Sequence, residues 1–90
     1  GRPSTIHKID FTDSSVTHST AFSADTSYVM LCAKTAGCHF VVASSPTATV
    51  NAGSYLPKDE VIIIKVSGGD KIGAIREAST NGSLYATEMV

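Results

Sequence analysis

The stretch Val61–Val90, VIIIKVSGGDKIGAIREASTNGSLYATEMV, decides the fold class. It holds three apolar runs of strand length, separated by segments rich in Gly, Ser, Asp and Asn. Short runs of β-branched residues bounded by such turn residues are typical of strands. We therefore predict a β-meander here, with one hairpin closing at Ser67–Asp70 and the next at Asn81-Gly82, the dipeptide best suited to a tight hairpin turn.

A further pair of strands is predicted upstream. The apolar runs Tyr28–Ala33 and Cys38–Ala43 flank the short segment KTAG, which predicts another hairpin. Alternate residues of a strand point to opposite faces, and both faces of Tyr28–Ala33 are apolar. The same holds in part for Lys71–Arg76. Strands of this kind lie inside a sandwich or at a contact between subunits.

In the amino-terminal third, the alternation of apolar and polar residues is weaker. In TIHKIDF, Ile6 and Lys8 share one side and His7 and Ile9 the other. The segment VTHSTAF adds a second alternating stretch, and no window has the apolar spacing of a helix. Six to eight short strands at this spacing predict an all-β fold, a small antiparallel β-sandwich or barrel of jelly-roll type, with residues 1–90 as one domain.

The charge and the apolar content of the chain limit the classes of partner that are expected. The 90 residues carry a net charge of −1, and the seven Lys and Arg residues are scattered singly, so direct nucleic-acid binding is not expected. No apolar stretch approaches the roughly 20 residues that span a bilayer, and no secretion signal is recognisable, although a processed chain would look the same. The expected chain is therefore a globular domain without a membrane anchor.

The two cysteines flank the predicted turn. If Ala33 pairs with Gly37, the thiols of Cys32 and Cys38 lie opposite one another and a disulfide can form. If Ala33 pairs with Cys38, the thiols fall on opposite faces. Two cysteines without an export signal favour reduced, buried thiols. A metal site from these cysteines and His39 is disfavoured, because adjacent strand residues point apart and paired C-x₂-C spacing is missing.

No pattern in the chain predicts catalysis. Serine and histidine are present, but no serine stands in a G-x-S-x-G turn, and His7 and His18 each stand alone in a polar alternation. The stretch SGGDK lacks the spacing and the following helix of a phosphate-binding loop. The expectation is a protein that is not an enzyme and has no cofactor or bound metal.

Three segments taken in order carry a resemblance to a known family. YVMLCAKTAGCHFVVASSPTAT at 28–49, YLP at 55–57 and GGDKIGAIREASTNGSLYATEM at 68–89 resemble small proteins encoded among the virion genes of tailed bacteriophages. The resemblance implies a β-sandwich of capsid decoration or cement type, made in the host bacterial cytoplasm. It further implies a homotrimer on the outer surface of the head, in contact with the major capsid protein or another virion protein, without catalytic residues.

The expected contact segment is an amino-terminal arm, residues 1–9, which is polar with isolated apolar residues and could add a strand to a neighbouring edge. Its candidate capsid or subunit contacts are Arg2, Ile6, Lys8 and Ile9. One rival is a tail, neck or fibre-associated adaptor of the virion. Another is a carbohydrate-binding module that uses the long loop SSPTATVNAGSYLP at 44–57. Against it, the chain has no Trp, and its tyrosines at 28, 55 and 85 are few for a role that needs exposed aromatic platforms.

Overall fold

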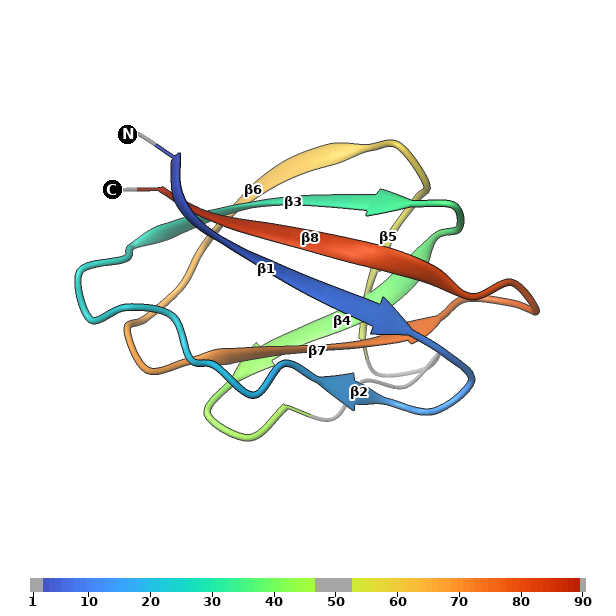
Figure 1. The fold of residues 1–90 in the computed structure, drawn as a ribbon, viewed down its shortest axis with the longest axis horizontal. Coiled ribbons are helices and arrows are strands. Elements are labelled where there is room, and N and C mark those ends of the chain that lie inside the picture. Colours follow the sequence, from blue (N-terminus) through green and yellow to red (C-terminus); the bar gives the residue numbers. More distant parts are fainter. Residues whose placement is uncertain (1–2, 47–52, 90) are drawn as a thin grey trace.

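A computed structural model describes residues 3–46 and 53–89, and in these the chain forms eight β-strands and no helix (Figure 1). Their bounds are β1 Pro3–Phe11, β2 Val16–Thr17, β3 Tyr28–Lys34, β4 Cys38–Ala43, β5 Ser54–Leu56, β6 Val61–Lys65, β7 Lys71–Arg76 and β8 Gly82–Met89. The predicted all-β class is confirmed.

The strands form two four-stranded antiparallel sheets. Sheet A has the order β1-β8-β3-β6 and sheet B the order β2-β7-β4-β5. The first strand pairs with the last, the second with the seventh, the third with the sixth and the fourth with the fifth. This nested pairing is that of a jelly roll, as predicted. Figure 1 shows the two sheets stacked, with the start of β1 and the end of β8 at the same end of the molecule.

The predicted hairpins and the meander are wrong. Consecutive strands β3 and β4 lie in different sheets, and so do β6 and β7, and β7 and β8. Their short connections carry the chain across the core from one sheet to the other. A period of two in the sequence reports which side chains share a face, but it does not report which strand lies alongside. Most of the strands were therefore predicted at the right place, except β5, which lies in a stretch expected to be a loop, and the strand partners were predicted wrongly.

Gly82 shows how a turn signal was misread. Instead of closing a hairpin with Asn81, it begins β8. A Cβ atom there would lie 2.6 Å from the Lys34 carbonyl oxygen and 2.7 Å from the ring of Phe11. The glycine thus permits close packing where β8 enters sheet A. The left-handed backbone angles are found elsewhere, with a φ of 76° at Thr35 and 92° at Gly69.

The core lies between the sheets. Sheet A contributes the inward side chains of Ile9, Phe11, Val29, Leu31, Ala33, Leu84 and Ala86, and sheet B those of Cys38, Phe40, Leu56, Ile72 and Ala74. Phe22 and Val66, from the connections, complete the cluster. Burial of this apolar surface is the main force that holds the two sheets together.

The expected amino-terminal arm is, over its described residues, an edge strand. β1 runs along β8 from Pro3 opposite Met89 to Phe11 opposite Gly82, with one irregularity before Ile6. The side chain of Ile9 is 2% exposed and belongs to the core, so it is not available to a capsid or a second subunit. This corrects both the free arm and the contact expected at Ile9.

Candidate contact surface

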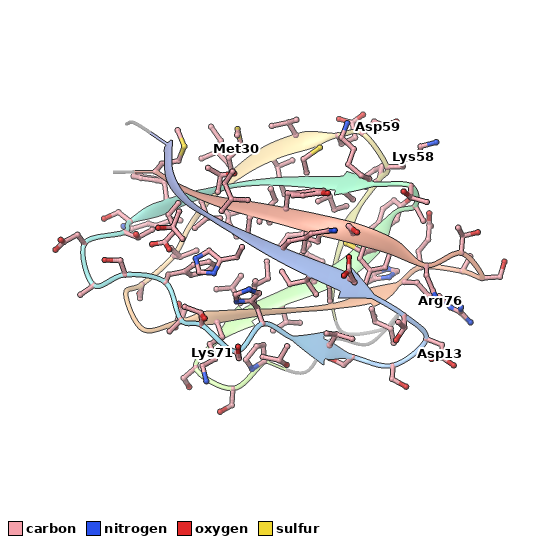
Figure 2. All side chains as sticks on the ribbon, viewed as in Figure 1. Asp13, Met30, Lys58, Asp59, Lys71 and Arg76 are labelled. Atoms are coloured by element: carbon pink, nitrogen blue, oxygen red, sulfur yellow. The ribbon has the colours of Figure 1, made fainter. Side chains whose placement is uncertain are left out.

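The outer face of sheet A is the side of the sheet turned away from sheet B. Its residues follow from the alternation of each strand and the register between strands. They are Ile6, Lys8 and Asp10 on β1, Ser83, Tyr85, Thr87 and Met89 on β8, Tyr28, Met30, Cys32 and Lys34 on β3, and Val61, Ile63 and Lys65 on β6. Met30, labelled in Figure 2, lies on the side of β3 away from sheet B.

Apolar side chains cross this face in register. Ile6 lies opposite Thr87, which lies opposite Met30, which in turn lies opposite Ile63. The two ends of this row, Ile6 and Ile63, are 63% and 61% exposed. In the described part of the chain, five large apolar side chains are exposed, and all but Tyr55 lie on this face. Scattered exposed apolar residues are ordinary, but four of the five gathered on one sheet face, with Ile6 and Ile63 in register on either side of Thr87 and Met30, mark a contact site.

A shallow depression lies in the middle of the face. It has a volume of about 370 Å³ and is lined by Met30, Cys32, Lys34, Tyr85 and Thr87. It therefore lies across the two central strands of sheet A, β3 and β8. Its lining is mostly apolar, so it is suited to receive an apolar side chain of a partner and has no cluster of groups for catalysis.

Charged side chains lie at the edges of the face. The Lys8 ammonium is 3.6 Å from the Asp10 carboxylate, and Lys34 is 3.2 Å from Asp59. A hydrogen bond from Ser83, followed by the charge of Lys8, lowers the pKa of Asp10. Exposed pairs of this kind add little to stability. An apolar centre with a polar rim is the usual anatomy of a protein–protein interface.

The structure brings two of the four predicted contact residues onto this surface. Ile6 and Lys8 are exposed on the outer face of sheet A, whereas Ile9 is in the core and Arg2 lies outside the described residues. The residues that sequence reasoning missed are Met30 on β3 and Ile63 on β6. The signal for Met30 was available, because Tyr28–Ala33 is apolar on both of its faces.

A cluster of buried polar groups lies at the other side of β1. The His7 ring nitrogen Nε2 donates to Glu88 Oε2 at 2.5 Å. The second carboxylate oxygen accepts a hydrogen bond from the Thr26 hydroxyl and one of 2.9 Å from the Ser23 N–H. His7, Thr26 and Glu88 are each 3% exposed or less. The cluster ties β1 and β8 to the connection that precedes β3.

Two aromatic rings complete the surroundings of His7. The His18 Nδ1 lies 3.3 Å from the His7 Nδ1, and the Phe22 ring meets the His7 ring edge to face at 5.2 Å. His7 is a residue of strand β1, as expected, but its contacts with His18 and Glu88 were not anticipated. His7 and Glu88 are far apart in the sequence, so no local pattern could have joined them.

Stability is expected to fall in acid through Glu88. Burial raises its pKa, but the hydrogen bonds from His7, Thr26 and the Ser23 N–H together bring that pKa below its ordinary value of 4.5. Because the folded-state pKa is the lower one, this contribution to the free energy of unfolding is present above pH 4.5. It is lost as the pH falls through the folded-state pKa.

The measurement is urea unfolding between about pH 6 and pH 2, in wild type and Glu88→Gln. The Gln variant should be less stable at neutral pH, and its stability should depend less on pH in this range. Identical pH profiles for the two proteins would show that another group controls the acid transition.

The cysteines lie in different sheets, so neither of the two registers considered for them applies. Both thiols are free. Cys38 is buried in the core, where burial and then the charge of Glu77 raise its pKa to about 12, as expected of an inert thiol. Cys32 lies half-buried on the outer face of sheet A, and His39 projects from the outer side of sheet B. These three residues are not brought together.

Among residues 3–46 and 53–89, no group of three or more His, Cys, Asp or Glu side chains is placed to hold a metal ion. Nor do these residues form a helix long and apolar enough to cross a membrane. No known protein family matches the chain, and searches of curated proteins and of solved structures found no match. The contact surface therefore rests on the geometry of this molecule alone.

Proposed function

We propose that this chain is a structural protein of a tailed-bacteriophage virion, of capsid decoration or cement type, which binds the outer surface of the head as a homotrimer. The observation that carries the proposal is the outer face of sheet A, where apolar rows with a charged rim are left uncovered by the chain itself. Such a surface is covered by protein in an assembly.

Two further arguments support this role. The jelly roll is used by viral capsid proteins, although it also occurs in lectins and cupins, so the fold alone does not choose a function. Residues 28–89 contain, in the same order, the segments that resemble phage virion proteins, and this resemblance favours a role in a viral particle. On a shell, modest contacts repeated around the particle strengthen one another through effective concentration, so each contact can be weak.

The test is co-sedimentation of the purified chain with heads of the phage that encodes it, with isolated tails of that phage as the control. Saturable binding to heads, and greater resistance of the coated heads to heat, are the expected results. Binding to tails alone would replace decoration by the adaptor role. Absence of binding to either particle would refute a virion function.

The carbohydrate-binding alternative has weaker support. Tyr28 and Tyr85 lie on the outer face of sheet A, whereas Tyr55 lies on β5 in sheet B. The three rings are therefore divided between two sheets and do not make one platform for a sugar. Residues 47–52 of the segment expected to bind the glycan lie outside the described residues.

A further inference from the structure

We infer that the outer face of sheet A is the surface through which copies of this chain pack against one another. This assigns a partner to the contact surface described above, and its biological setting rests on the proposed function. The alternative occupants are the shell protein, another virion protein and a segment of a longer chain. Three features of the face favour a second copy.

The first feature is size. Four strands about 4.8 Å apart, each about seven residues long at roughly 3.3 Å per residue, make a face of about 19 by 23 Å. A partner that covers this face and its rim approaches the roughly 800 Å² per partner of a standard stable interface. The face together with its rim is thus of the size that one contact between neighbouring subunits requires.

The second feature is composition. The row from Ile6 to Ile63 has no charged side chain, and the next row has only Lys8, at its β1 end, beside Tyr85, Cys32 and Val61. The Lys8 ammonium lies 6.0 Å from the centre of the Tyr85 ring, above the edge of the face. Interfaces between identical subunits are more apolar than transient ones. This centre has that character.

The third feature is the state of the isolated chain. Ile6, Val61 and Ile63 are each more than half exposed, although the core between the sheets is complete without them. A chain that is free before it reaches a shell would carry this face bare in solution, where it favours aggregation. Assembly with its own copies covers the face as soon as the chain has folded.

The test is the molar mass in solution of wild type and of the double variant Ile6→Glu/Ile63→Glu, by light scattering after gel filtration and by sedimentation equilibrium. Both side chains are exposed, so the double variant should fold, which far-UV circular dichroism checks. Wild type should be an oligomer. The variant should be a monomer, with self-association weakened at least about 100-fold. The control Ser19→Glu/Ser54→Glu adds the same two charges at exposed positions outside sheet A and should remain oligomeric.

Cys32 provides an independent readout. It lines the depression in the middle of the outer face, whereas Cys38 is fully buried in the core. Labelling of Cys32 by a maleimide should be slow in wild type at concentrations where it is an oligomer, and fast in the monomeric double variant. Equal labelling rates would show that this face stays open in the oligomer, and would overturn the inference.

The outcomes separate this inference from the proposed function. A monomeric wild type that still binds heads would overturn self-packing and leave decoration standing. An oligomer that the double variant disperses, but which binds no phage particle, would support self-packing and refute decoration. An oligomer that survives the double substitution would place the subunit contact on another surface.

Discussion

Deletion of residues 1–9 is expected to unfold the protein. The deletion removes most of β1 and therefore the pairing partner along one side of β8. It also removes Ile9 from the core and His7 from the Glu88 carboxylate. Loss of one buried Ile typically costs about 2–5 kcal/mol, and loss of one partner of a buried pair about 3–5 kcal/mol. Their sum, about 5–10 kcal/mol, covers the lower half of the stability expected of a small domain, about 5–15 kcal/mol, and the lost pairing of β1 with β8 adds to it.

Far-UV circular dichroism and a thermal melt measure this effect. The truncated chain should lack the strand spectrum and the cooperative transition. The matched control is Ile6→Ser/Lys8→Ser, which keeps the backbone of β1 and changes only two outward side chains. This control should melt cooperatively, so it can test contacts of β1 that the deletion cannot. A truncated protein with the wild-type spectrum and melt would show that β1 is dispensable.

The substitution Glu88→Ala is expected to lower the free energy of unfolding by about 3–5 kcal/mol at neutral pH. The carboxylate accepts from His7, from the Thr26 hydroxyl and from the Ser23 N–H, and the first two of these residues are buried. Without it these donors lose their acceptor in a place that water reaches poorly. Leaving a buried polar group unsatisfied costs more than its hydrogen bond contributed.

Urea unfolding at neutral pH measures the cost, with Glu60→Ala as the matched control. Glu60 is exposed at the entry to β6, so its removal should change stability by less than about 0.5 kcal/mol. The double variant His7→Phe/Glu88→Leu replaces the central pair by apolar side chains, and it should recover part of the loss. If Glu88→Ala unfolds at the same urea concentration as Glu60→Ala, the cluster does not stabilise the fold.

Most of the strands and the type of sandwich could be predicted from sequence, whereas the pairing of the strands could not. The predicted runs Cys38–Ala43 and Lys71–Arg76 are β4 and β7 with the same bounds. That Ile6 and Lys8 share one face of the strand was also predicted correctly. The pairing of the strands could not be predicted, because a short connection such as residues 35–37 can either form a hairpin within one sheet or cross from one sheet to the other. Which of the two occurs depends on strands that are distant in the sequence and not on the connection itself. For β3, these are its pairing partners β6 and β8.

The candidate surface was visible in part. A strand with apolar residues on both faces is predicted to be buried on both sides or to contact another subunit or partner. In β3 the second alternative explains why the apolar side chain of Met30 lies on the outer face of sheet A. The register that aligns Met30 with Ile6 and Ile63 needs the whole topology, so the row could not be read from the sequence. The buried cluster was invisible for a stronger reason, because its carboxylate and its imidazole come from opposite ends of the chain.

The nested order of the strands has a consequence for how the protein is made. Within this domain β1 is synthesised before the other strands and its partner β8 after them, so β1 must wait unpaired while β2 to β7 are made. The innermost pair, β4 with β5, is the one that can close early, and the outer pairs can then add in turn. Folds dominated by contacts between distant residues fold slowly, in milliseconds to seconds. During that wait β1 is the segment that a chaperone would have to protect.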